Sequence, residues 1–150
     1  MAKSRITHVM VLADGSEQGF RAAEQAIGLA KTAGAKLTAI SVIDTDTLRQ
    51  LLTYNILAAQ EMTDFESELE ASARQYLDRV RAMAMDDKVV AEQVLVKGPY
   101  HAAVLAQQEQ LTVDLLVLPG FKSGRATRDL LAREYQKIAD QAPCPVMLVK

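Results

Sequence analysis

The chain has 150 residues, of which 49% are hydrophobic and 24% are charged, and its formal net charge is −2. These values exclude a disordered chain and predict one packed domain over residues 1–150. Basic residues form no run and no stripe with interleaved aromatic residues, so we expect no nucleic-acid partner. No apolar stretch reaches the ~18 residues of a membrane span. The single cysteine, Cys144, is typical of a reducing compartment, and we expect a cytoplasmic protein.

Apolar runs alternate with helical patterns along the chain. Five runs have the length and β-branched content of strands, at residues 7–13, 37–43, 89–96, 114–118 and 146–149. Helices are expected between them, at residues 19–34, 63–85 and 101–110 and from the loop after the fourth strand to about Gln141. Ser16 is the expected N-cap of the first helix and Gly34 its expected stop. This order predicts an α/β fold with a doubly wound, Rossmann-like, five-stranded parallel sheet and helices on both faces.

Two loops are predicted at the ligand-binding edge of such a sheet. Ligands bind beyond the carboxyl ends of the strands, where the strand order reverses. The sequence DGSEQG follows the first strand there, and GFKSGRAT follows the fourth. The second loop contains Gly120, Lys122 and Gly124, which are residue types typical of phosphate sites, but the spacing of a P-loop is absent.

No pattern predicts catalysis or metal binding. The two histidines, His8 and His101, have no cysteine or glutamate partner at ligand spacing, so we interpret them as surface or capping residues. Cys144 lies between two prolines with no local group to activate its thiol, and is predicted to be a small core residue. A serine nucleophile elbow is absent as well.

Four stretches, taken in order, resemble the universal stress protein family over nearly the whole chain. The family's opening strand, Asp-Gly-Ser turn, first helix and second strand are matched by VMVLADGSEQGFRAAEQAIGLAKTAGAKLTAISVID. Its third strand and following helix are matched by LVKGPYHAAVLAQQ, its fourth strand by VDLLVLPG and its ending by APCPVMLVK. The resemblance implies an adenine nucleotide alpha hydrolase-like form of the predicted fold.

One branch of that family binds ATP through a glycine pattern, G-x2-G-x9-G-[ST], and the other branch lacks the pattern. Glycines are needed because a Cβ would keep phosphate oxygens away from the backbone N–H groups. Counting back from the APCP sequence places the glycine positions on Pro119, Lys122 and Ala132, and the hydroxyl position on Arg133. A shift by one residue restores only Gly120. Since proline also lacks an N–H donor, we expect a degenerate nucleotide site.

The resemblance therefore implies a non-enzymatic, dimeric module of the stress response with no cofactor and with a regulatory protein partner. The alternative is a nucleotide sensor that binds ATP or AMP, in which Lys122 or Arg133 replaces lost backbone contacts. The residues that would then bind the ligand are Asp14, Val42, Gly98, Gly120, Lys122, Gly124 and Arg133. Asp14 also has a structural interpretation as a cap of the first turn and helix. A third hypothesis, a slow ATPase or phosphotransferase, has only Asp14 to support it.

Two apolar segments are candidate surfaces for contact with a second copy of the chain or with a partner protein. The last strand, Val146–Val149, has no polar residue, and a bare edge strand is a liability unless it is covered or paired. Family members commonly pair this strand across a two-fold axis, so the resemblance implies a homodimer. The segment from Leu48 to Met62 is also rich in apolar residues, and it either packs on the sheet or faces a partner.

Overall fold

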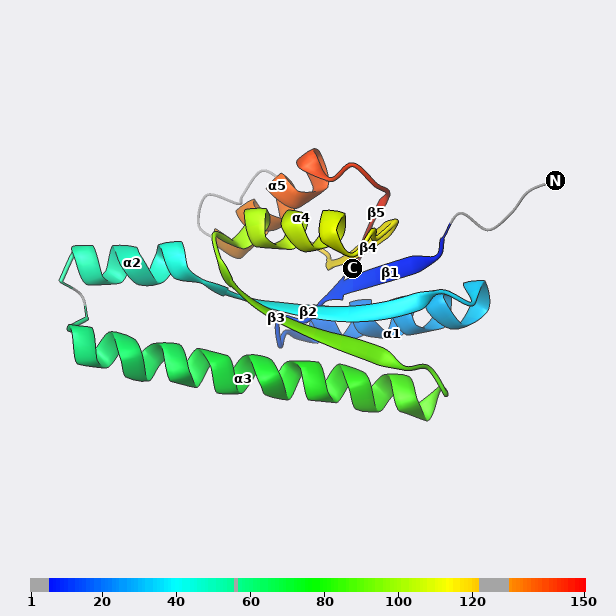
Figure 1. The fold of residues 1–150 in the computed structure, drawn as a ribbon, viewed down its shortest axis with the longest axis horizontal. Helices are drawn as coiled ribbons and strands as arrows, with labels where there is room; N and C mark the ends of the chain where they lie inside the picture. The colour runs from blue at the N-terminus through cyan, green and yellow to red at the C-terminus, as the bar shows by residue number, and fades with distance from the viewer. Residues whose placement is uncertain (1–5, 56, 122–129) are drawn as a thin grey trace.

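The computed structural model describes residues 6–55, 57–121 and 130–150. Five parallel strands form one sheet in the order β3-β2-β1-β4-β5 (Figure 1). The strands are β1 (His8–Leu12), β2 (Lys36–Asp44), β3 (Ala91–Gly98), β4 (Leu115–Pro119) and β5 (Val146–Val149). The predicted five-stranded parallel sheet is confirmed. Its strand order reverses between β1 and β4, which is where such sheets bind ligands.

Helices cover both faces of the sheet. They are α1 (Glu17–Ala33), α2 (Thr45–Thr53), α3 (Ala59–Asp86), α4 (Tyr100–Gln110) and α5 (Leu130–Gln141). Helices α1 and α3 pack on one face, and α4 and α5 pack on the other (Figure 1). Within the described ranges, no helix combines the length and apolarity needed to cross a membrane.

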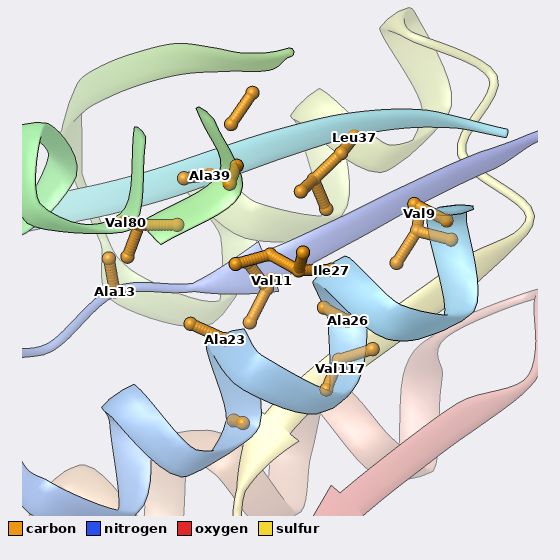
Figure 2. Close-up of a cluster of buried hydrophobic side chains, with 14 of the residues drawn as sticks. Val9, Val11, Ala13, Ala23, Ala26, Ile27, Leu37, Ala39, Val80 and Val117 are labelled. Atoms are coloured by element: carbon orange, nitrogen blue, oxygen red, sulfur yellow. The ribbon is translucent and has the colours of Figure 1, made fainter. Parts of the chain in front are cut away.

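The central strands supply the core because both of their faces are covered. All residues of β1 and β4 are buried, as expected for runs that do not alternate with polar residues. On one face the side chains of β1 meet α1, whose small residues allow close approach. Figure 2 shows this cluster, which includes Val9, Val11, Ala23, Ala26, Ile27 and Val117. Met10 and Leu12 point to the opposite face, against α4 and α5.

Both ends of α1 are closed as the sequence predicts. The Oγ atom of Ser16 accepts a hydrogen bond from the backbone N–H of Gly19 at 2.9 Å, so Ser16 is the N-cap. At the other end, Gly34 has a φ of 65°, a left-handed conformation that glycine adopts without strain. Ala35 N–H then bonds to the carbonyl of Ala30 at 2.9 Å. These two caps fix where the loop after β1 ends and where the connection to β2 begins.

The segment between β2 and α3 differs from the prediction. Helix α3 begins at Ala59 instead of residue 63, and a separate helix, α2, precedes it. The signal for α2 is Asp44, the last residue of β2, whose carboxylate accepts hydrogen bonds from the N–H groups of Asp46 and Thr47. Within the segment, Leu48 is buried while Tyr54 is 74% exposed. The segment therefore both packs against the molecule and presents apolar surface.

Two further positions refine the sequence interpretation. His8 is buried, with Nε2 2.7 Å from Thr38 Oγ1 and Nδ1 3.1 Å from the carbonyl of Leu111. The prediction of a surface or capping histidine is wrong there, because a strand start can bury a polar ring that finds two partners. Cys144 packs at the margin of the core between the sheet and α5, and burial raises the pKa of its thiol.

Candidate functional site

The candidate site lies beyond the carboxyl ends of β1 and β4. Asp14 follows β1, and Gly120 follows β4. These two strands pair directly, with Val11 beside Val117 in the register. Because parallel strands end at the same edge of a sheet, Asp14 and Gly120 lie at the same edge, where the strand order reverses. The topology therefore places Asp14 and Gly120, two of the predicted site residues, at one edge of the sheet.

The Asp14 carboxylate is bonded to the protein through both oxygens. Its Oδ1 atom accepts from Ser16 N–H at 2.9 Å and from Ser16 Oγ at 2.6 Å. Its Oδ2 atom accepts from the Tyr135 hydroxyl at 2.5 Å. The first contact is the predicted turn-capping role, and the second ties β1 to α5. Asp14 is thus engaged on both sides of its carboxylate by groups of this chain.

Tyr135 belongs to a cluster of three aromatic side chains, Tyr100, Phe121 and Tyr135, called the aromatic cluster below. Tyr135 is only 3% exposed, and its ring centroid lies 6.0 Å from that of Tyr100 and 6.4 Å from that of Phe121. Burial, together with the neighbouring Tyr100 and Asp14, raises the pKa of Tyr135 far above its ordinary value. Its hydroxyl therefore stays protonated and remains a donor to Asp14 throughout the physiological pH range.

Gly120 has a structural role that accounts for its identity. Its N–H donates to the carbonyl of Val149 at 2.6 Å, extending the ladder between β4 and β5. A Cβ at this position would lie 2.8 Å from the same carbonyl oxygen and 3.0 Å from the Cα of Lys150. The preceding Pro119 pairs with Val149 in the same ladder and has no N–H. The Gly120 N–H is therefore used by β5, and Pro119 has none to offer to a phosphate.

The other predicted site residues are dispersed. Val42 is half-buried and packs against the core beneath α4 and α5. Gly98 has a φ of 152° and precedes the Pro99 N-cap of α4. Arg133 is exposed and lines a polar groove of ≈ 250 Å³, whose described lining residues do not include Asp14. Lys122 and Gly124 lie outside the described residues.

That polar groove, between the start of α2, the start of α4 and α5, contains carboxylates that are already engaged. Glu134 Oε1 lies 2.9 Å from His101 Nδ1 and accepts from His101 N–H at 3.1 Å, and Oε2 pairs with Lys137 at 3.0 Å. Burial alone would raise the pKa of Glu134, but these contacts outweigh it and lower the pKa below its usual range. The ionised Glu134 thus ties the start of α4 to α5.

Sequence reasoning missed Tyr135, Tyr100 and Glu134. Tyr135 lies three residues from Ile138 and from Ala132, so helical spacing could have placed it on the buried stripe of α5. Its contact with Asp14 joins residues 121 positions apart and follows only from the tertiary structure. Across the part of the chain that the structure describes, no group of three or more histidine, cysteine or acidic side chains could hold a metal ion.

Comparison with known proteins agrees with this architecture. The model of the universal stress protein family matches residues 5–150. A universal stress protein of Methanocaldococcus jannaschii is 27% identical over 143 residues, covering 95% of this chain and 81% of that protein. The structure of universal stress protein UspA from Lactobacillus plantarum has a TM-score of 0.77 and 19% identity, covering 99% of this chain and 100% of that one. A universal stress protein solved in complex with cAMP has a TM-score of 0.72 and 23% identity, covering 98% of this chain and 99% of that one. The chain belongs to the universal stress protein family.

Proposed function

We propose that this universal stress protein is a non-enzymatic, dimeric regulatory module that acts through protein partners and does not use a nucleotide. The observation that carries the nucleotide-free part of the proposal is the bond from the buried Tyr135 hydroxyl to the Asp14 carboxylate. Asp14 matches the position at which the family contacts adenosine. A ligand that took the place of Tyr135 at Oδ2 would break this bond, and a hydrogen bond to a charged group contributes about 1.5–3 kcal/mol.

The loop after β4 supports the same proposal. A phosphate cradle needs backbone N–H groups that are free to approach oxygen atoms. Here Pro119 has no N–H, and the N–H of Gly120 is bonded to Val149. Ala132 of α5, which takes a glycine position of the family's pattern, is buried. To bind a nucleotide as the family does, the chain would have to break the Gly120–Val149 hydrogen bond and make room at Ala132.

We expect isothermal titration with ATP, AMP or cAMP to give no dissociation constant tighter than about 10 μM, equivalent to roughly 7 kcal/mol of binding free energy. The physical reason is that Asp14 and the Gly120 N–H are bonded within the chain and that Pro119 has no N–H. ATP hydrolysis should also be no faster than in buffer. Binding at or below that concentration would overturn the nucleotide-free part of the proposal.

The alternative function is a nucleotide sensor, and the relative solved in complex with cAMP favours it. In this alternative, the Arg133 guanidinium in the polar groove pairs with a phosphate of the nucleotide. This charge pair replaces the backbone contacts that the family's glycines would allow. An Arg133→Ala variant separates the two functions once any nucleotide binds. The sensor requires weaker binding by this variant, whereas unchanged binding would remove Arg133 from the site.

The proposed dimer forms through β5, which is an edge strand of the sheet. The carbonyls of Pro145 and Val149 accept hydrogen bonds from β4. Because bonding direction alternates along a strand, the N–H and carbonyl of Leu148 point away from β4, and its side chain is 40% exposed. A second copy could pair with these groups, as the family resemblance implies.

We therefore expect light scattering at micromolar concentration to give twice the mass of one chain, and a Leu148→Pro variant to give a single chain. Proline removes the outward N–H and is tolerated at a sheet edge. Leu148→Ala is the matched control, because it keeps the N–H and should remain dimeric. A monomeric wild-type protein would contradict the proposed dimer.

A further inference from the structure

A groove at the end of the molecule opposite Asp14 is lined by three lysines. It lies where α1 and α3 end and where β2 and β3 begin, at the right-hand ends of these helices in Figure 1, and its volume is ≈ 420 Å³. The lysines are Lys31 and Lys36, on either side of the connection from α1 to β2, and Lys88, in the connection from α3 to β3. Glu92 is the acidic residue among its described lining residues. We call this feature the lysine groove.

The three lysines have no ion-pair partner among the residues that the structure describes. All the ion pairs seen there involve other cations, such as Lys97 with Glu66 and Glu70. Asp86 and Asp87 precede Lys88 in the chain but do not line the groove. The lining therefore carries a local excess of positive charge in a chain whose net charge is −2. Such an excess attracts an anionic group.

The lysine groove also has apolar surface. Ala30 and Leu37 line it from the core side, and Val90 lies at its margin with 80% of its surface exposed. A small inorganic anion would satisfy the lysines and leave Val90 in water. A ligand that combines carboxylates with an apolar side chain would satisfy both parts of the surface.

The backbone at Lys88 determines which substitution can test the groove. Helix α3 ends at Asp86, Lys88 follows with a φ of 61°, and Val89 N–H bonds back to the carbonyl of Ala84 at 2.8 Å. At the end of α1, the same left-handed conformation is adopted by Gly34. Glycine suits this position, and a side chain there strains the backbone. Asn55 after α2 and Thr112 after α4 take the same conformation, so this is an ordinary helix ending, and a Lys88→Gly substitution removes the lysine without changing the turn.

We propose that the lysine groove binds an acidic peptide segment of a partner protein. The peptide's carboxylates pair with Lys31, Lys36 and Lys88, and an apolar side chain covers Val90. This inference rests on the proposed function for the existence of a protein partner, but it uses none of the residues near Asp14. If the peptide does not bind, the conclusion from the nucleotide titrations still stands. If a nucleotide does bind, the peptide experiment still tests the lysine groove.

The experiment is fluorescence anisotropy with a fluorescein-labelled peptide in which glutamates alternate with leucines. We expect saturable binding to the full chain that weakens as salt rises, because exposed charge pairs are screened beyond about 10 Å at 0.1 M. Lys88→Gly should weaken binding about threefold, since one exposed ion pair is lost. This variant keeps the left-handed turn, so its circular dichroism should match the wild type.

Val90→Ser should weaken peptide binding by a similar factor. The combined Lys31→Gln, Lys36→Gln and Lys88→Gly variant should weaken it by more than about tenfold.

Arg49→Gln is the matched control, because it removes one positive charge from α2 at the other end of the molecule and should leave peptide binding unchanged. Three results would overturn the proposal. One is equal affinity for a peptide with serines in place of leucines, together with full displacement by pyrophosphate, which would indicate a small-anion site. Another is self-association of the chain that the combined variant abolishes, which would make a second copy the occupant. The third is absence of peptide binding at low salt.

Discussion

Replacing Tyr135 with alanine is expected to lower the free energy of unfolding by about 3–5 kcal/mol, the range for truncating a buried aromatic side chain. The ring is almost fully buried and contacts both Tyr100 and Phe121. Its removal leaves a cavity between α5 and the end of β1 and also leaves Asp14 Oδ2 without its donor. Urea unfolding followed by circular dichroism measures the loss.

A Tyr135→Phe variant separates the hydroxyl from the ring. It keeps the aromatic cluster, so the expected loss is only about 1–3 kcal/mol, the cost of leaving the carboxylate oxygen unpaired. A double-mutant cycle with Asp14→Ala, which removes the acceptor, isolates the shared bond and should give a coupling of about 1 kcal/mol or more. Stability unchanged by Tyr135→Phe would mean that the hydroxyl does not hold Asp14, and the main support for a nucleotide-free site would be lost.

Replacing Gly15 with alanine should destabilise the protein by about 2–3 kcal/mol. Gly15 has a φ of 80°, in the left-handed region where a side chain costs about 1–2 kcal/mol. An added Cβ would also overlap the ring of Tyr76 from α3, and displacing that ring adds roughly 1 kcal/mol. The substitution therefore strains the turn that carries Asp14 and Ser16. Chemical unfolding measures the change.

Gly28→Ala is the matched control, and we expect it to stabilise the protein, whereas Gly15→Ala destabilises it. Gly28 lies within α1, and an added Cβ there meets no atom within 4 Å. Alanine favours a helix interior over glycine, so we expect a gain of about 0.5–1 kcal/mol. Equal losses at both positions would show that the left-handed turn and the Tyr76 contact do not determine the effect at Gly15.

The sequence was sufficient to predict those parts of the fold that depend on local patterns. Apolar runs located the five strands, and Ser16 and Gly34 marked both ends of α1, because strand burial and helix capping act over a few residues. Helix α2 was missed, since it is short and its capping residue, Asp44, is also the last residue of a strand. A local sequence pattern does not show that one residue, here Asp44, both ends a strand and caps the next helix.

The candidate site was less accessible to prediction. The pattern of substitutions at Pro119 and Arg133 predicts a degenerate cradle, and the nucleotide titrations test that hypothesis. The sequence gives no sign that Tyr135 donates to Asp14, or that Gly120 is bonded to β5, because both contacts join distant segments. The lysine groove has the same origin, since its three lysines come together only when two helices end beside two strand starts.

The strand order has a consequence for how the chain reaches its native state. Strands β1, β2 and β3 can pair soon after collapse, whereas β4, which covers the other side of β1, lies about a hundred residues further along the chain, and pairing over such separations is slow. Until β4 pairs with β1, the sheet consists of β3, β2 and β1, and the backbone N–H and carbonyl groups on the open side of β1 have no partner strand. Such a species would be vulnerable to intermolecular strand pairing, so crowded or heated conditions during refolding should favour aggregation over recovery.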